Sequence, residues 1–304
     1  MARGEAGIAA KKSTKTAEAR FRAFETFCAT HGYLGVSYAS VTSFLADFMG
    51  KNQDHTASLS GVLSNLRTQH SRRELAFLSP HDDDRVKRLL EEWKKQDASA
   101  VQRKDPLRFP LLQQIIGRMD LTKVSQLQQA TQLLLATQAV LRTKEITSGL
   151  RGADVVWKPD RVVAIHLAPT KTCKDGRGVW IEVADSTHEL SAYKLLKRLC
   201  EARNLQHRPG DFVFCQIRQG VLSPEVKSSE RAWRKLIKTS VAAIGLDPAR
   251  YSGHSARAGG ATDLFAAGLP YYVIKKYGRW KSDAALIYYR CETSIARCAA
   301  TAFS

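Results

Sequence analysis

The chain has 304 residues, of which 44% are hydrophobic and 25% are charged, a balance typical of a soluble protein with a sizeable apolar core. At about 150 residues per domain, this length predicts two domains or one large one. Lysine and arginine number 47 against 29 acidic residues, a net charge of +18. So basic a chain favours a polyanionic partner such as nucleic acid over a protein with merely basic faces, but it does not distinguish DNA from RNA.

Several classes of protein are excluded at this level. The sequence contains no run of about 18 uncharged apolar residues, so we expect no membrane span, and the N-terminus lacks the apolar segment of a secretory signal. The six cysteines are scattered without a Cys-x-x-Cys pair, which excludes a disulfide scaffold or a zinc ribbon and fits a reducing compartment. Nucleotide-binding loops of the GxxxxGK[ST] and GxGxxG types, HExxH and GxSxG are also absent.

The first third of the chain predicts a small helical module. Residues 1–16 carry four positive charges and no aromatic residue, and we expect a disordered basic tail there. Residues 17–97 predict an all-helical domain, because apolar residues recur at helical spacing. Its expected helices are 16–31, 38–49, 55–69 and one that begins near residue 79. The acidic run at residues 82–84 stands at that last helix start, where carboxylates favour the helix dipole, so a structural role is preferred to a metal site.

The remainder mixes helices with short strands. Residues 98–106 are polar and end in a proline, and they predict a linker. Residues 107–304 form the second expected domain, with strands at 162–167 and 178–183 joined by a turn at Asp175-Gly176. The expected helices are 107–118, 124–138, 187–203, 227–243, 257–267, 271–276 and 283–289. The fold class predicted is therefore mainly α with a small antiparallel β-sheet.

Basic and aromatic residues gather near the C-terminus, in GHSARAGGATDLFAAGLPYYVIKKYGRWKSDAALIYYR from Gly253. His254 and Arg257 are three residues apart and share a face at a helix start. Gly259 and Gly260 leave room for another backbone to approach closely. The Gly278-Arg279-Trp280 string follows, and then a pair of tyrosines, Tyr288 and Tyr289.

This segment resembles the tyrosine recombinase (phage integrase) family, whose pattern is His-x-x-Arg, then Trp or His, then a nucleophilic tyrosine. Upstream, Arg142 with Glu145 three residues later resembles the family's first arginine motif, and Lys171 stands in a strand–turn position like that of the family lysine. The helical residues 17–97 resemble its core-binding domain. The resemblance covers almost the whole chain and implies a two-domain clamp on DNA.

The resemblance implies that a tyrosine attacks a DNA phosphodiester, giving a 3′-phosphotyrosyl bond and a free 5′-hydroxyl without metal or cofactor. Arginine forks match phosphate oxygens, while an imidazole exchanges a proton near neutral pH. The implied roles are phosphate neutralisation for Arg142 and Arg257, protonation of the leaving oxygen for Lys171, phosphate or proton contact for His254, an indole hydrogen bond for Trp280, and support of His254 or an arginine by Glu145.

Some of these assignments have structural alternatives. Arg142 and Glu145 suit a simple i,i+3 ion pair, Trp280 suits a core position, and Lys174 competes with Lys171, which its Thr-Lys-Thr context favours. Tyr289 lies nine residues after Trp280, the spacing of most bacterial and phage relatives. The Tyr288-Tyr289-Arg290 string instead resembles the Tyr-x-Arg ending of many eukaryotic mobile-element recombinases, and on that ground Tyr288 is preferred.

The function expected is site-specific recombination or integration of a mobile element. Basic residues exceed acidic ones by 17 to 12 over residues 1–104 and by 30 to 17 over residues 105–304, which suits a two-sided grip on double-stranded DNA. The resemblance also implies a homotetramer on DNA, in which the segment after Arg290 either passes to a neighbouring subunit or folds back. A type IB topoisomerase and a catalytically silent DNA-binding relic remain as alternatives. Nucleus and bacterial cytoplasm both stay open as locations.

Overall fold

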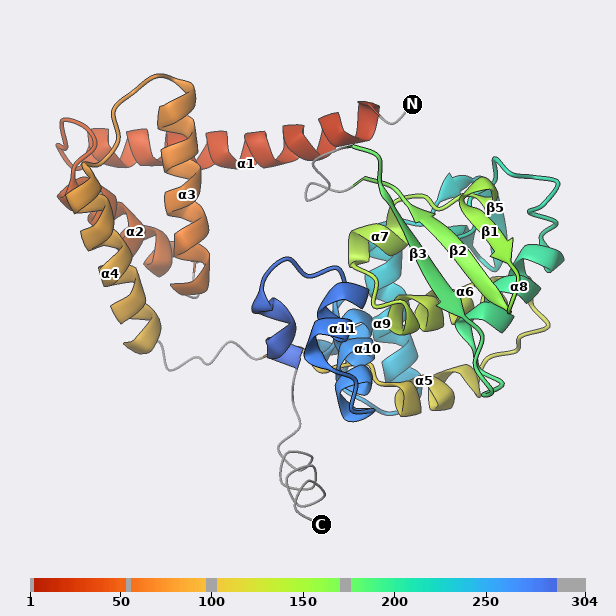
Figure 1. Ribbon diagram of the computed structural model, residues 1–304. Helices are drawn as coiled ribbons and strands as arrows, with labels where there is room; N and C mark the ends of the chain where they lie inside the picture. The colour runs from red at the N-terminus through yellow and green to blue at the C-terminus, as the bar shows by residue number, and fades with distance from the viewer. Residues whose placement is uncertain (1–2, 53–55, 97–102, 170–175, 289–304) are drawn as a thin grey trace, which may run out of the picture. The chain divides into compact units, whose positions relative to one another are not determined.

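The computed structural model describes residues 3–52, 56–96, 103–169 and 176–288 (Figure 1). The chain divides into two compact units, Met1–Gln102 and Arg103–Ser304, and each unit is described by itself. Within the described residues, no helix is both long enough and apolar enough to cross a membrane.

The first unit is helical throughout its regular structure. Its helices pack around one cluster of buried side chains, in which Phe24, Phe44, Leu63 and Leu66 are almost fully removed from water. These residues are the apolar positions that recur at helical spacing, so burial of one face of each helix explains the packing. The helices are α1 (Arg3–Thr30), α2 (Tyr38–Asn52), α3 (Thr56–Arg72) and α4 (Pro80–Gln96).

One expectation for this unit was wrong. Residues 1–16 were expected to be a disordered tail, but α1 begins at Arg3. The segment is rich in alanine and lysine, which have high helix propensity, and it continues the register of a helix whose later turns are buried. Helix α2 likewise runs past Gly50 to Asn52, because an exposed glycine weakens a helix without necessarily ending it.

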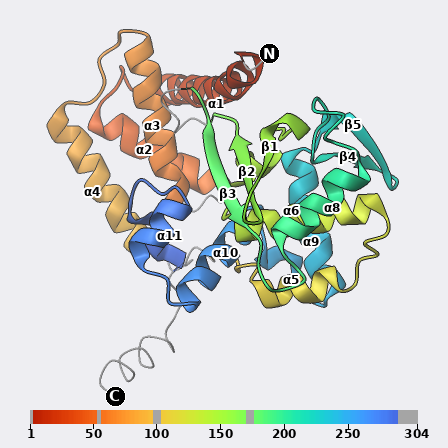
Figure 2. The same cartoon turned by 45° about the vertical axis from the view of Figure 1, so that its right-hand side comes forward.

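The second unit combines helices with two small antiparallel sheets (Figure 2). The order β1-β2-β3 forms one sheet, in which His166 pairs with Trp180 and Val163 pairs with both Trp157 and Val183. The strands β4 and β5 form the second sheet. The bounds are α5 (Phe109–Ile116), α6 (Val124–Gln138), α7 (Thr143–Thr147), β1 (Val155–Lys158), β2 (Val162–Leu167), β3 (Val179–Ala184), α8 (Ala192–Ala202), β4 (Cys215–Arg218), β5 (Val221–Lys227), α9 (Glu230–Ala243), α10 (Ser255–Ala266) and α11 (Tyr271–Tyr277), with 3-10 helices η1 (Gly152–Asp154), η2 (Pro248–Arg250) and η3 (Asp283–Tyr288).

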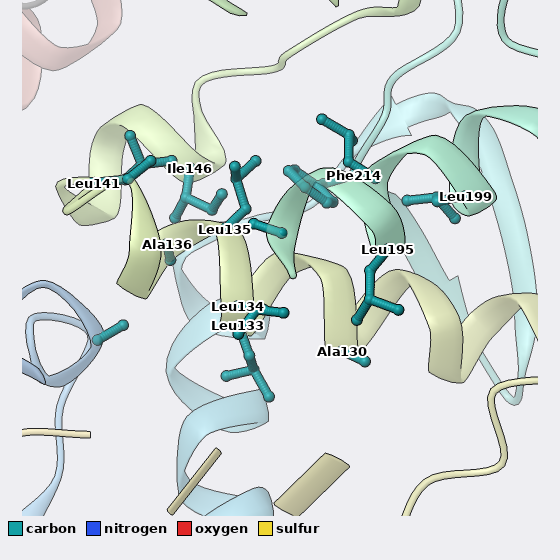
Figure 3. Close-up of a cluster of buried hydrophobic side chains, with 14 of the residues drawn as sticks. Ala130, Leu133, Leu134, Leu135, Ala136, Leu141, Ile146, Leu195, Leu199 and Phe214 are labelled. Carbon is teal, nitrogen blue, oxygen red and sulfur yellow. The ribbon is translucent and has the colours of Figure 1, made fainter. Parts of the chain in front are cut away.

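Helix α6 lies at the centre of the core of this unit (Figure 3). Leu133, Leu134 and Leu135 are all fully buried although they are consecutive, and the polar Gln128 and Thr131 are buried as well, so the helix is covered on every side. Side chains of α8 and of β2 complete the same cluster. The core therefore fixes the C-terminal end of α6, from which the chain leads to Arg142.

The predicted mainly helical class with antiparallel strands is confirmed, and the strand at 162–167 has the predicted bounds. The strands β1, β4 and β5 were not predicted, and β5 occupies the start of the helix expected at 227–243. Short edge strands of mixed polarity carry little alternation to detect. Helix α9 begins instead after Ser229, whose side chain accepts a hydrogen bond from the backbone N–H of Ala232.

The glycine pair of α10 has the predicted role of close approach. A Cβ on Gly259 would stand 1.9 Å from the carbonyl oxygen of Leu107, and one on Gly260 would stand 1.9 Å from that of Thr137. No side chain fits at such separations. The two glycines therefore bring α10 against the start of α5 and the end of α6, which places Arg257 beside the segment that carries Arg142.

Candidate active site

Arg257 is held near the N-terminus of α10 by the chain segments on either side of it. Its guanidinium group donates hydrogen bonds to the carbonyl oxygens of Val140, through Nη1, and of Gly278, through Nη2 at 2.5 Å. The guanidinium carbon lies 4.0 Å from the centre of the Trp280 ring, in a cation–π contact. Arg257 is only 3% exposed. Its position is thus defined by two backbone acceptors and an aromatic face.

Arg142 and Glu145 stand at the start of α7. The backbone N–H of Arg142 donates to Glu145 Oε2 at 2.7 Å, and its side-chain Nη1 donates to Oε1 at 2.6 Å. The i,i+3 ion pair proposed from the sequence is therefore present, but Glu145 is 3% exposed, unlike the carboxylate of a solvated surface pair. Arg142 also donates through Nη2 to the carbonyl oxygen of Arg279 at 2.8 Å.

Arg279 completes this cluster and was not among the residues assigned from the sequence. Its Nη2 donates to Glu145 Oε2 at 2.9 Å, so one carboxylate binds two arginines. The signal that could have identified it is its place between Gly278 and Trp280 in the motif. A bare sequence motif gives no reason to prefer this arginine to a solvated one.

The charges of these residues are strongly coupled. Burial alone would raise the pKa of Glu145, but Arg279 and the hydrogen bonds from Arg142 lower it overall, so the carboxylate stays ionised. Burial, followed by the charge of Arg142, lowers the pKa of Arg257 to about 9, so this side chain remains a cation at neutral pH. Two guanidinium groups thus bind one carboxylate with a third in electrostatic range, and the excess positive charge suits a phosphate diester.

His254 and Tyr288 border the same cluster. His254 occupies the N-cap position of α10, and desolvation, followed by the charges of Arg257 and Arg234, lowers the pKa of its imidazole below the usual 6.5. Its ring is therefore neutral at pH 7 and able to accept a proton. The ring of Tyr288 lies 5.7 Å from that of Trp280, and the backbone carbonyl of Tyr288 accepts a hydrogen bond from Thr262.

Glycine permits the position of Trp280. A Cβ on Gly278 would overlap the Trp280 ring, at 1.7 Å from one of its carbon atoms, so the ring lies directly over this residue. Gly253, which directly precedes His254, also allows close packing, because a Cβ there would lie 2.9 Å from Thr143 Oγ1. Its carbonyl oxygen accepts the indole N–H of the buried Trp233, which holds the backbone leading into His254.

The structure brings together Arg142, Glu145, His254, Arg257, Trp280 and Tyr288 from the set predicted by sequence. Lys171, its competitor Lys174, Asp175, Tyr289 and the segment after Arg290 lie outside the described residues. Among the residues that are described, no group of three or more His, Cys, Asp or Glu side chains could hold a metal ion. What the described cluster offers chemically is cationic binding of an anion beside a neutral imidazole and a phenol.

The mainly helical fold with small antiparallel sheets thus carries a cationic cluster that can bind an anion. Residues 107–294 match the phage integrase family. This match spans more than half of the chain, which therefore belongs to the phage integrase family of tyrosine recombinases, enzymes that bind, break and rejoin DNA.

The chain is similar to Recombinase cre of Escherichia phage P1, with 26% identity over 241 residues that cover 75% of this chain and 68% of that protein. Its fold is similar to that of the XerH site-specific recombinase bound to palindromic difH substrate, with a TM-score of 0.66 at 13% identity over 95% of this chain and 78% of that one. A lambda integrase dimer bound to a core site gives a TM-score of 0.57 at 13% identity, over 91% and 88% of the two chains. At these identities, the two solved structures show the fold alone.

Proposed function

We propose that this protein is a site-specific DNA recombinase or integrase that works through a 3′-phosphotyrosyl intermediate. The observation that carries the proposal is the cluster in which Arg142 and Arg279 bind Glu145, while Arg257 stacks on Trp280 beside Tyr288. Such a cluster neutralises a phosphate whose charge increases in the transition state. The tyrosine oxygen attacks the phosphorus and the bond to the 5′-oxygen breaks, so the ester energy is kept for rejoining.

Each residue has a part in that reaction. Arg142 and Arg257 bind the non-bridging oxygens of the scissile phosphate, and the indole N–H of Trp280 donates to one of them. His254, neutral at pH 7, accepts the tyrosine proton or hydrogen-bonds the phosphate, while Lys171 protonates the leaving 5′-oxygen. Arg257 donates one hydrogen bond each to Val140 and Gly278, which leaves three of the five N–H groups of its guanidinium for phosphate.

The nucleophile is one of the two adjacent tyrosines. Adjacent side chains of a helix or strand point in different directions, so we expect one phenol to face the phosphate and the other not to. Tyr288 is supported by its ring contact with Trp280 and by its proximity to the charge of Arg257. Tyr289 is supported by its spacing of nine residues from Trp280, and the adduct experiment below distinguishes the two.

We further propose that the protein binds double-stranded DNA and acts as a homotetramer, with two protomers on each site. A net charge of +18 supports DNA binding that weakens steeply with salt. The scattered cysteines support a reducing compartment, either a nucleus or a bacterial cytoplasm.

The test is covalent capture. Purified protein is incubated with supercoiled DNA that carries the sequences flanking its own coding region, in chelator and without ATP, and then quenched with detergent. We expect a protein–DNA adduct on a peptide that contains residues 288 and 289, and mass spectrometry of that peptide locates the nucleophile. The Y288F/Y289F double variant is the control and should give no adduct.

The outcomes separate the alternatives. Recombined products together with the adduct support the proposal. An adduct with relaxation but without strand exchange between sites would indicate topoisomerase activity instead. Binding to the same DNA without any adduct, including on nicked substrates that trap the intermediate, would reject the proposed chemistry in favour of a DNA-binding relic.

The pH dependence of adduct formation tests the part assigned to His254. Because its folded-state pKa lies below 6.5, we expect adduct formation to stay constant from pH 8 down to about 6.5 and to fall only as the imidazole becomes protonated at lower pH. The H254Q variant should be slower at pH 7 and lose this acid limb. The free energy of unfolding changes with pH in the same direction. Below pH 6.5 the unfolded chain protonates His254 before the folded chain does, so the folded state loses stability there. An unchanged acid limb in H254Q would remove His254 as the proton acceptor.

A further inference from the structure

Arg279 has a backbone conformation that an arginine does not readily adopt. Its φ is +60°, in the left-handed region that costs an L-residue about 1–2 kcal/mol and that glycine occupies without cost. The preceding residue, Gly278, has an ordinary αR conformation at φ −79°. Strain at a single residue persists where surrounding interactions determine the geometry, so the contacts of this arginine indicate what maintains it.

Those contacts connect two segments that are far apart in sequence. The Arg279 side chain donates to Glu145 Oε2 at 2.9 Å, to the carbonyl oxygen of Val140 at 3.2 Å and to that of Tyr277 at 2.9 Å. Its own backbone carbonyl accepts the hydrogen bond from Arg142 Nη2 at 2.8 Å. Arg279 thus binds the segment of Arg142 through its side chain and its main chain at once.

The environment makes these interactions strong. The side chain of Arg279 is 16% exposed and that of Glu145 only 2%, so water screens the pair weakly. Hydrogen bonds between ionised partners are also the stronger kind. The Nε atom of Arg279 is buried without a hydrogen-bond partner among the described groups. An arginine held at such a cost points to a function beyond packing.

Glu145 is the link between the two arginines. Its Oε1 binds the Arg142 side chain, while its Oε2 is shared by the Arg142 backbone N–H and Arg279. Without the Arg279 side chain, this buried carboxylate has one cationic partner fewer, while the backbone carbonyl of residue 279 still accepts from Arg142. The adjacent Trp280 and Tyr288 lie on the same segment as Arg279, so their placement relative to Arg142 depends on the same contacts.

We propose that Arg279 is a positioning residue for strand cleavage, which fixes the segment of Trp280 and Tyr288 against Arg142 through Glu145. The inference rests on the proposed function, since it assigns Arg279 a part in that same site. Arg279 itself does not touch the reacting phosphate. It keeps Glu145 ionised and Arg142 oriented, so its loss slows the covalent step more than it weakens DNA binding.

The cleanest deletion is Arg279→Gly, because glycine accepts the left-handed backbone while the side-chain contacts are lost. We expect R279G to lower the rate of adduct formation by about 10- to 100-fold, as for loss of a charge-assisted hydrogen bond to a buried group, with DNA affinity within about threefold of wild type. The R279K variant keeps the charge without the planar fork and should recover part of the rate.

The chain offers a matched control in Arg161. It is also an arginine at left-handed φ, +57°, paired with a carboxylate, Asp185, but its side chain is 68% exposed and it lies in the turn between β1 and β2. The R161G variant removes the same charge from the same backbone conformation. We expect its adduct rate to stay within about twofold of wild type, since Asp185 keeps Lys194 and its serine hydrogen bonds and does not contact the cluster.

Two further readouts distinguish positioning from a general structural defect. The R279G/E145Q double variant should be no slower than E145Q alone, because both substitutions break one interaction. In R279G the Glu145 carboxyl loses one cationic neighbour, so its pKa should rise and an acid limb due to Glu145 should remain in R279G/H254Q, where the limb due to His254 is absent. A structural defect would lower the rate at every pH without adding that limb.

A measurement without DNA keeps the inference testable if the proposed function fails. NMR titration of the Glu145 carboxyl in wild type and in R279G should show a higher pKa in the variant. A wild-type protein that forms no adduct rejects the proposed function, while the raised pKa of Glu145 still supports the role of Arg279 as its partner. An unchanged Glu145 pKa, or an R279G adduct rate equal to that of R161G, would overturn the inference.

Discussion

Arg257→Lys is expected to lower the rate of covalent adduct formation by about 10²- to 10³-fold, the usual effect of removing one preorganised donor to a transition-state charge. The guanidinium group bridges the carbonyl oxygens of Val140 and Gly278 and stacks on Trp280. A lysine ammonium is a point charge that cannot span both acceptors or present a planar fork to phosphate. Retained charge should keep DNA affinity within a few-fold of wild type.

The measurement is single-turnover adduct formation at saturating protein, with binding determined separately at fixed salt. Lys276 is exposed on the last turn of α11, and the reciprocal substitution Lys276→Arg exchanges the same two residue types outside the cluster. We expect K276R to react like wild type. An R257K protein that forms the adduct at the wild-type rate would show that Arg257 serves the fold and not the reaction.

Gly260→Ala is expected to destabilise the second unit by about 3 kcal/mol or more, the upper range for overpacking a core. The added methyl group would stand 1.9 Å from the carbonyl oxygen of Thr137 and 3.3 Å from the Val140 side chain. Backbone atoms cannot turn aside as side chains do, so α10 must move away from the end of α6. That movement would also withdraw Arg257, one turn earlier on α10, from the Val140 carbonyl.

Thermal unfolding followed by tryptophan fluorescence checks this, because four of the five tryptophans lie after residue 103 and therefore report on the second unit. Gly210→Ala is the control: its Cβ would meet nothing within 4 Å and its φ is not left-handed. We expect G210A to melt within a degree or two of wild type and G260A to melt clearly lower, on the order of 5 °C or more. Equal melting temperatures in the two variants would mean that α10 and α6 are less closely packed than described.

Hydrophobic periodicity identified those helices and strands whose apolar pattern lies within one continuous stretch of chain. Helix α6 has the predicted bounds because Leu127, Ala130 and Leu134 recur at helical spacing, and strand β2 has them because its apolar run is nearly continuous. The strands β4 and β5 escaped prediction, because β5 contains Pro224 and pairs with β4 through a register shift. Each of these two strands is stabilised by its partner strand and by the surrounding residues more than by an alternation of polar and apolar residues in its own sequence.

At the start of the chain, regular structure was again missed, for a different reason. A basic stretch without aromatic residues predicted disorder, whereas α1 begins at Arg3. Composition measures whether a segment can bury apolar surface, but a helix that is already nucleated by buried later turns extends at little cost. The error therefore came from treating residues 1–16 as independent of the helix that follows them.

By itself, the sequence determined the residue types and their order: Arg142, Glu145, His254, Arg257, Trp280 and the tyrosine pair, with a charge balance suited to DNA. The tertiary structure decided which of them meet. Glu145 and Arg279 are 134 residues apart, and their ion pair depends on the close approach that Gly259 and Gly260 permit between α10 and the ends of its neighbours. Periodicity reports on neighbours along a helix or strand, whereas a buried carboxylate acquires its partners only when separate segments pack together.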